Sequence, residues 1–369
     1  MKRWLVILII LISACRPGSQ GNGDFKQNSQ ELLKMSDLID TNSVQTIILE
    51  TTDENLISYV KQIVVTEKYL FVLNKVPSEI IMFDKNGKFI RKIGYQGRGA
   101  GEYLQIRNIY VDESKKEIIS FDSENCKIFI YGYNGDFIRT ISNKNNPYGQ
   151  VARLNDTLYC LNNNSNKTKI DNNPAILILN DKGELIKSFH PRIHMEGKRN
   201  VIPIAVGPAF FAENATGKYY VPLGSDTIFH LSVTDKEVVT KPVLCLGIED
   251  YFFPPDISQK EYNKNVNRYF DPFQALVVND YGLFYGEVVF QGKIVSIFGD
   301  LTKGMDKVGI VTGDNDVWPV LVTPQASYKD YFVDVVDGSM AREYRNNYFN
   351  VPEGSNPVVV LFKFKTDQD

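Results

Sequence analysis

Histidine, tryptophan and cysteine are scarce in this sequence, whose 369 residues include 3 His, 2 Trp and 4 Cys. So few histidines argue against a His-rich metal site or several His-based catalytic centres. The sequence also contains no HExxH, CxxC or GxSxG pattern, so the commonest zinc, redox and serine-hydrolase signatures are missing. Basic residues (41) are fewer than acidic ones (44) and form no cluster, which argues against a nucleic-acid partner.

What is present is ordinary globular composition, with 43% hydrophobic and 23% charged residues. Aromatic residues are abundant, with 22 Phe and 20 Tyr. Length alone favours two or three domains, but all-β proteins of this size are often a single unit.

The N-terminus has the pattern of a cleaved export signal. Lys2 and Arg3 precede an apolar run, Leu5 to Leu11, which is too short to span a bilayer as a mature helix. The following segment, Ile12 to Cys15, resembles a bacterial lipobox. This resemblance predicts a signal peptide over 1–14, lipidation of Cys15, and a flexible tether over 15–42. The alternative is an ordinary secretory signal in which Cys15 stands by chance.

Three further cysteines, Cys126, Cys160 and Cys245, are far apart and lie in or beside apolar runs. We expect them to be buried thiols. One disulfide with one free thiol is the alternative in an oxidising compartment.

An internal repeat is the strongest signal in the chain. A strand, a tight turn and a second strand recur, and their turn glycines Gly87, Gly135 and Gly183 are 48 residues apart each time. The Asn86-Gly87 pair predicts a type I′ turn, in which both central residues have positive φ. A period in the forties that is built of hairpins is typical of a four-stranded propeller blade.

Each repeat also contains an earlier strand pair, which gives four strands per unit. Three more degenerate units follow, and the sixth lacks its outer strand. We therefore predict an all-β, six-bladed β-propeller with four-stranded antiparallel blades over 43–369. In this prediction Val320 to Val322 is the first strand of blade six, and Val44 to Leu49 closes the ring by pairing with Val358 to Phe364.

Several segments carry a family resemblance: Ile93 to Tyr103, Ile109 to Asp112, Tyr131 to Arg139 and Asn356 to Lys363. They resemble NHL/TolB-like propeller blades, and more closely the six-bladed β-propeller lipoproteins of Bacteroidota. The sequence departs from that pattern at Ala100, where the family often has proline. The resemblance implies the fold and a cell-envelope location, and it assigns no activity.

Candidate ligand contacts are few. Arg98 and Glu102, in a glycine-rich loop, either face the channel or belong to a structural crossing between blades. Arg192 and His194 follow the last strand of the third blade and are placed near a rim. Trp318 either stacks on a sugar or packs in the core.

Two insertions depart from a minimal blade, near 249–273 and near 325–349. The first is rich in Tyr and Phe, and both contain stretches of helical character. Their aromatic residues either pack on neighbouring blades or form a lid or recognition surface at the channel mouth.

The sequence favours a binding or scaffold role over catalysis. We expect a lipoprotein anchored in the outer membrane, whose propeller binds a glycan, a peptide or an envelope protein. The periplasmic side is favoured over the cell surface, which is the alternative. No metal or cofactor is predicted for this role. The alternative is a metal-dependent propeller hydrolase, lyase or lactonase with Ca²⁺ or Zn²⁺ at the central channel.

Overall fold

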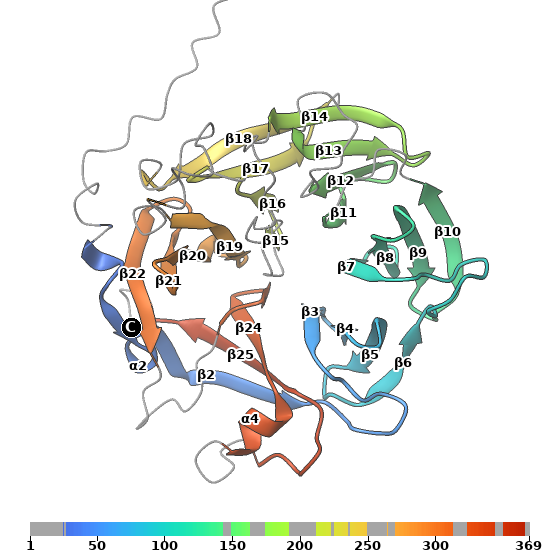
Figure 1. Ribbon diagram of the computed structural model, residues 1–369, viewed down its shortest axis with the longest axis horizontal. Coiled ribbons are helices and arrows are strands. Elements are labelled where there is room, and N and C mark those ends of the chain that lie inside the picture. Colours follow the sequence, from blue (N-terminus) through green and yellow to red (C-terminus); the bar gives the residue numbers. More distant parts are fainter. Residues whose placement is uncertain are drawn as a thin grey trace, which may run out of the picture.

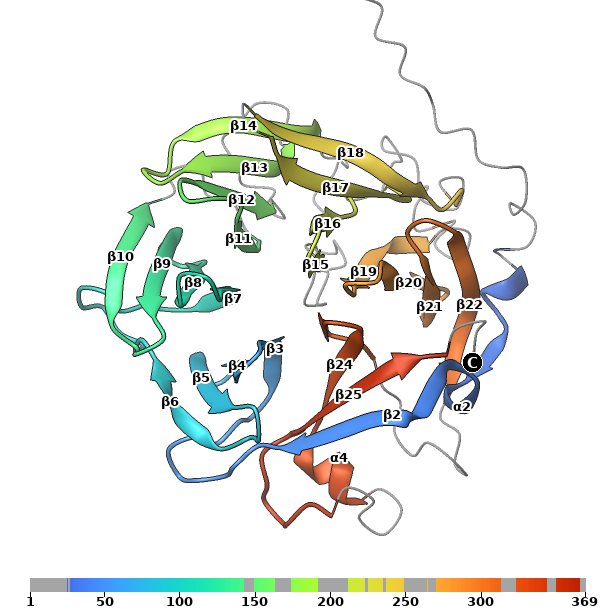
Figure 2. The ribbon, with the colours of Figure 1, turned by 180° about the vertical axis from the view of Figure 1, so that it is seen from behind.

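The computed structural model describes residue 25 and residues 27–142, 149–162, 174–191, 212–222, 225–234, 237–248, 264, 270–312, 323–343 and 350–365. Six β-sheets stand around a central axis (Figure 1). The view from behind shows the same closed ring (Figure 2). No helix in this part of the chain is long and apolar enough to cross a membrane. The predicted all-β ring of six blades is confirmed.

Each blade is an antiparallel sheet of four strands, and its first strand lies innermost. In blades 1 to 5, the four strands are consecutive in sequence. Blade 6 has three consecutive strands, and its outer strand comes from the N-terminal part of the chain. Blades 1 to 3 contain β3 (Val60–Val65), β4 (Tyr69–Asn74), β5 (Glu79–Asp84) and β6 (Phe89–Ile93); β7 (Ile106–Asp112), β8 (Glu117–Asp122), β9 (Lys127–Gly132) and β10 (Phe137–Ser142); and β11 (Val151–Arg153), β12 (Leu158–Asn162), β13 (Pro174–Asn180) and β14 (Leu185–Pro191).

Blades 4 to 6 follow the same plan with longer connections. They contain β15 (Ala212–Asn214), β16 (Gly217–Tyr220), β17 (Thr227–Val233) and β18 (Val238–Cys245); β19 (Phe270–Val278), β20 (Leu283–Phe290), β21 (Lys293–Asp300) and β22 (Gly304–Thr312); and β23 (Ala326–Tyr328), β24 (Tyr331–Val336) and β25 (Val358–Phe364).

An N-terminal strand closes the ring, as predicted. Strand β2 (Ile39–Ile48) pairs antiparallel with β25 as the outer strand of blade 6, with Thr46 opposite Val360. The Asn356 side chain fastens the junction, because its Nδ2 donates to the carbonyl oxygen of Glu50 at 2.8 Å while its Oδ1 accepts from the amide of Ile57 at 2.8 Å. This closure ties the two ends of the described chain together and pairs the edge that β25 would otherwise leave open.

The inner strand of blade 6 differs from the prediction. It is β23, at Ala326–Tyr328, which falls inside the insertion predicted over 325–349. The predicted strand at 320–322 lies outside the described residues. The predicted helical character is present in α4 (Gly338–Glu343), between β24 and β25.

The predicted tether does not extend to residue 42. Strand β1 (Leu32–Lys34) adds to blade 5 as a fifth strand, parallel to β22, and the short helix α2 (Met35–Leu38) leads on into β2. Phe25, Met35 and Leu38 are buried between the blades. Widely spaced apolar residues in a polar stretch thus pack against the ring, and from residue 27 to 42 the chain belongs to the folded domain.

The predicted type I′ turn is wrong in its detail. Only Gly87 has a positive φ (86°), and Asn86 does not. The Gly87 amide donates to the Asp84 carbonyl oxygen at 3.0 Å, while Asp84 Oδ1 accepts from the amides of Asn86 and Lys88. This is a type I turn followed by a glycine bulge, and the Asp84 side chain favours it by satisfying the turn amides itself.

Glycine is also needed at this turn position, in each of the three repeats, because of its contact with the preceding blade. A Cβ on Gly87 would overlap the carbonyl oxygen of Ile48 in the preceding blade, and a Cβ on Gly183 would overlap that of Ser142. The equivalent approach at Gly135 is looser, with the Lys92 oxygen 3.3 Å away. The sequence period therefore records a close backbone contact from each blade to the next.

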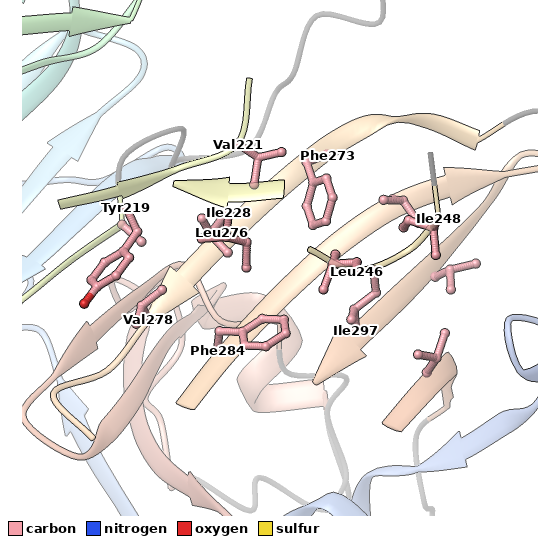
Figure 3. Close-up of a cluster of buried hydrophobic side chains, with 14 of the residues drawn as sticks. Tyr219, Val221, Ile228, Leu246, Ile248, Phe273, Leu276, Val278, Phe284 and Ile297 are labelled. Atoms are coloured by element: carbon pink, nitrogen blue, oxygen red, sulfur yellow. The ribbon is translucent and has the colours of Figure 1, made fainter. Parts of the chain in front are cut away.

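The hydrophobic core lies between neighbouring blades. Figure 3 shows one such seam, where Tyr219 and Ile228 of blade 4 pack with Leu276, Phe284 and Ile297 of blade 5. Phenylalanine and tyrosine fill many of these positions, which accounts for the aromatic surplus.

The three described cysteines form no disulfide. Cys160 is fully buried, which raises its pKa to about 12, so it behaves as a structural thiol. Cys126 and Cys245 are only partly buried, so the prediction of buried thiols holds fully for one of the three.

Candidate functional site

The inner strands of all six blades surround a central channel with a cavity volume of about 150 Å³. That volume holds a few water molecules or a small chemical group. Polar side chains from five of the blades line it alongside apolar ones: Gln62, Asn108, Gln150, Glu213, Gln325 and Ser327.

Two of these amides join neighbouring inner strands. Gln62 on β3 donates to the Ile109 carbonyl oxygen and accepts from the Ile109 amide, both at 2.8 Å. Asn108 on β7 makes the same pair of hydrogen bonds with the backbone of Val151 in β11, at 3.0 and 2.9 Å. Each side-chain amide thus substitutes for a peptide group and satisfies the free edge of the next inner strand. We call these contacts the amide clasps.

Gln325 is held by a buried carboxylate instead. Its Nε2 donates to Asp334 Oδ1 at 2.9 Å, and Asp334 also accepts from the amides of Thr323 and Val335. Burial raises the pKa of Asp334 to about 7 despite these three donors, and the charge of Glu287 on blade 5 adds to the rise. Asp334 therefore fastens the segment that leads into β23.

The one charged side chain that lines the cavity, Glu213, is paired. Lys218 donates to its Oε1 at 2.7 Å, and the Tyr110 hydroxyl donates to it at 3.2 Å. Burial opposes the Lys218 charge, but the attraction of Glu213 and Tyr110 outweighs burial and raises the pKa of Lys218 above its ordinary value. Glu213 remains partly exposed, with 41% of its side chain accessible.

The two faces of the ring differ in the length of their connections. Because the strands within each blade are antiparallel, the link from first to second strand leaves at one face, and the link into the next blade starts at the other. We call the first the short-turn face, defined by the turns 66–68, 113–116, 154–157, 215–216, 279–282 and 329–330. We call the second the long-loop face, defined by the links between blades, 49–59, 94–105, 143–150, 192–211, 246–269 and 313–325, and by the link 337–357 between β24 and β25 of blade 6.

The short turns bind one another around the ring. Glu67 pairs with Lys329 at 2.8 Å, the Asp280 amide donates to the Lys329 carbonyl oxygen at 2.8 Å, and the Ala215 amide donates to Asp280 Oδ1 at 2.7 Å. Lys115 and Asp156 form a further ion pair between blades 2 and 3. The polar groups of this face are thus largely engaged in holding neighbouring blades together.

The long-loop face includes part of each predicted insertion, because 249–273 overlaps the connection 246–269 and 325–349 overlaps the link 337–357. Strand β23, the short turn 329–330 and β24 also fall within 325–349. It also contains Arg98 and Glu102, in the connection that leads into β7. Arg98 is exposed. Glu102 folds back on its own loop, where its Oε2 accepts from the Gly99 amide at 2.7 Å. The two residues therefore differ in role: Arg98 is accessible to a ligand, whereas Glu102 stabilises the conformation of its own loop.

The other predicted site residues, Cys15, Arg192, His194 and Trp318, fall outside the described part of the chain. Among the residues that the structure describes, no group of three or more His, Cys, Asp or Glu side chains is placed to hold a metal ion.

Sequence reasoning missed the amide clasps and the ion pair between buried Lys218 and partly exposed Glu213. A signal for the clasps was present, because Lys61-Gln62-Ile63 and Arg107-Asn108-Ile109 repeat a cation, an amide and an isoleucine in consecutive blades. Lys218 carried no such signal: Glu213 is only five residues away in the sequence, but the second partner, Tyr110, belongs to another blade.

Fold and channel together define the class of protein: a six-bladed β-propeller closed by its N-terminal strand. More particularly, the chain belongs to the family described as Domain of unknown function (DUF4934), whose model matches residues 22–363. A search of curated proteins finds no match.

Among the solved structures similar to this chain are two proteins of Bacteroides. One is a protein of Bacteroides fragilis NCTC 9343 that is named for its proposed export, with a TM-score of 0.70 and 17% identity over 91% of this chain and 100% of that one. The other is a member of the DUF4221 family from Bacteroides vulgatus ATCC 8482, with a TM-score of 0.53 and 12% identity over 88% of this chain and 99% of that one. At such identities the likeness concerns the fold alone.

Proposed function

We propose that this protein is a lipid-anchored protein of the bacterial cell envelope whose propeller binds a glycan, a peptide or an envelope protein on its long-loop face. The single observation that carries the binding proposal is the contrast in connection length between the two faces. Long connections on a rigid scaffold are where proteins place variable recognition residues. The amide clasps and the linked short turns supply the rigid scaffold.

Two inserted epitopes test which face binds. One is a short Gly/Ser-flanked peptide placed after Arg98, on the long-loop face; its matched control is the same peptide placed after Ser114, at the other end of β7. Both residues are exposed, so both insertions should fold. Purified peptidoglycan fragments, outer-membrane glycans and periplasmic proteins of the host are then tested for binding to the full-length protein in detergent.

We expect the insertion after Arg98 to abolish binding and the insertion after Ser114 to preserve it. Loss of binding in the Ser114 variant alone would move the site to the short-turn face. Failure of every fraction to bind the wild-type protein would refute the binding role.

The envelope location is proposed from the lipobox at Ile12 to Cys15, and the export assigned to the B. fragilis neighbour is consistent with it. Cys15→Ser should move the protein from the membrane pellet of the host to the soluble envelope fraction, because the acyl anchor would be lost. A Cys15→Ser protein that stays in the pellet would refute the anchor. Resistance to protease added to whole cells, with cleavage after the outer membrane is opened, is expected for the periplasmic side.

A further inference from the structure

A contact between blades 2 and 4 reaches past blade 3 at the central channel. Blade 3 lies between them around the ring (Figure 1), but its inner strand β11 has only three residues. The Tyr110 hydroxyl of β7 donates to Glu213 Oε1 of β15 at 3.2 Å, and Lys218 Nζ lies 4.8 Å from the centre of the Tyr110 ring. The amide clasps join adjacent blades, whereas this contact joins blades that are not adjacent.

This contact lies toward the short-turn face. Tyr110 is three residues before the turn 113–116, and Glu213 is two residues before the turn 215–216. Both side chains line the cavity, so their contact bounds the channel on this side. A group that enters from the long-loop face therefore meets Glu213 deep in the channel.

Glu213 keeps one carboxylate oxygen for a further partner. Among the described residues, its hydrogen bonds come from Lys218 and Tyr110, and both end on Oε1. The Glu213 side chain is 41% accessible, whereas that of Lys218 is only 8% accessible. Oε2 of Glu213 is thus a hydrogen-bond acceptor that is open to the channel.

The negative charge of Glu213 is already balanced. Lys218 pairs with it at 2.7 Å, and no other charged side chain of the described residues lines the cavity. Burial, reinforced by the charge of Glu213, raises the pKa of Tyr110, so the phenol stays protonated and donates. A cationic ligand group would gain little from a carboxylate that already has a cation, and an anionic group would be repelled. A neutral hydrogen-bond donor fits this acceptor best.

The amide side chains of the cavity supply donors that complement Glu213. A primary amide has two N–H hydrogens. In the described bonds, Gln62 uses one of them toward Ile109, and Gln325 uses one toward Asp334. The second hydrogen of each amide remains for a ligand, so the cavity offers donors as well as an acceptor. A hydroxyl group matches such a lining, because it donates one hydrogen and accepts through two lone pairs.

We propose that the channel binds the hydroxyl-bearing end group of a glycan, with Glu213 Oε2 accepting from one hydroxyl and the amides of Gln62 and Gln325 donating to sugar oxygens. This inference rests on the proposed binding role of the long-loop face, and it selects the glycan among the ligand classes proposed there. The cavity volume of about 150 Å³ admits a small group, so the glycan enters by its end. A peptide that inserts a cationic side chain is the alternative to exclude.

Matched monosaccharides test the charge of the ligand group on the wild-type protein. Glucose and galactose are compared with their 2-amino and uronic acid analogues, which have the same ring but add an ammonium or a carboxylate group. The full-length protein is kept near pH 6 in a detergent without a sugar headgroup, and binding is measured by ligand-observed NMR titration. We expect at least one neutral sugar to bind more tightly than both of its charged analogues.

Removal of the acceptor should weaken this binding. Glu213→Gln removes the charge from the oxygen that accepts the sugar hydroxyl, so the dissociation constant of the neutral sugar should rise about tenfold or more. Glu54→Gln is the matched control, because Glu54 is an exposed glutamate outside the cavity, on the link 49–59. This variant should bind the sugar as the wild-type protein does.

Tighter binding of the amino sugars would overturn the proposal and indicate a cationic group, such as a lysine side chain of a peptide. Absence of binding by every monosaccharide would also overturn it, as would unchanged sugar binding in Glu213→Gln. The comparison of sugars uses the wild-type protein, so it decides even if the variant fails to fold.

The channel site and the proposed function can fail separately. Envelope glycans that bind the wild-type protein while no monosaccharide does would refute the channel site alone. Monosaccharide binding together with envelope binding that survives the insertion after Arg98 would refute the long-loop face alone.

Discussion

The two faces of the ring use polar groups in opposite ways. On the short-turn face, side chains and turn amides of neighbouring blades bond to one another, as in the chain of contacts from Ala215 through Asp280 and Lys329 to Glu67. On the long-loop face, connections are longer, Arg98 is exposed, and Glu102 bonds within its own loop. The difference teaches that the short turns link neighbouring blades around the ring, whereas the long connections also present exposed residues such as Arg98.

The largest expected effect on stability concerns Asp334, the buried carboxylate that holds the segment leading into β23. The raised pKa of Asp334, about 7, means that folding favours its protonated form. Its contribution to stability is complete below the ordinary carboxyl pKa and is lost as pH rises through 7, because the unfolded state releases this proton more readily. The free energy of unfolding should therefore fall by about 3 kcal/mol between pH 4 and pH 7 because of this group.

Asp334→Asn should remove most of that slope, measured by urea denaturation at a series of pH values. Asp181→Asn, at an exposed turn residue, is the control and should leave the slope unchanged. An unaltered slope in Asp334→Asn would show that the carboxylate is charged across this range.

The next largest effect is expected from removing the ion pairs of Arg153, which connect blades 2 and 3 near the short-turn face. Arg153 is buried and donates to Asp112 at 2.7 Å and to Glu117 at 2.5 Å, which joins blade 3 to blade 2. Arg153→Met should cost about 3 kcal/mol, because it leaves two poorly solvated carboxylates without a partner. Arg91→Met, at an exposed arginine that bonds only a turn carbonyl, should cost less than about 1 kcal/mol. Equal losses would contradict the difference in burial.

A smaller loss of stability is expected from glycine-to-alanine substitutions, and a matched pair of glycines distinguishes backbone strain from steric overlap. Gly183 and Gly282 have the same φ of 80°, but a Cβ would overlap the Ser142 oxygen at Gly183, whereas at Gly282 it would make only an ordinary contact with Leu301 Cβ at 4.0 Å. Gly282→Ala should cost about 1 kcal/mol for the left-handed backbone. Gly183→Ala should cost about 2 kcal/mol or more, because the preceding blade must also move. Identical melting temperatures for the two variants would show that the blades adjust without cost.

The smallest effect on stability is expected on the long-loop face. Arg98→Ala should change the free energy of unfolding by less than about 0.5 kcal/mol, because the side chain is exposed. It should nevertheless weaken binding of the envelope ligand. A stability loss as large as that of Arg153→Met would contradict the assignment of this face to recognition.

The repetitive parts of the fold could be predicted from the sequence. The hairpins of blades 1 to 3 share a 48-residue period, and the pairing of β2 with β25 followed from one unassigned strand and one missing strand. The turn type could not be predicted, because the Asp84 side chain decides it by accepting from two turn amides.

The packed N-terminal segment could not be predicted either. Its apolar residues Phe25, Met35 and Leu38 have no regular spacing, and they are buried by contacts with blades more than two hundred residues away. The candidate site shows the same limit. Gln62 and Asn108 were visible as a repeated motif, but the backbone groups that they bond, at Ile109 and Val151, are identified only by how neighbouring blades are placed.

Site-specific photo-crosslinking in the native host tests the central claim most directly. A photoreactive amino acid replaces Arg98 on the long-loop face or Ser114 on the short-turn face, at opposite ends of one strand. Irradiation should yield a discrete adduct with an envelope component from position 98 and none from position 114. An adduct from position 114 alone, or equal adducts from both positions, would contradict the assignment of binding to the long-loop face.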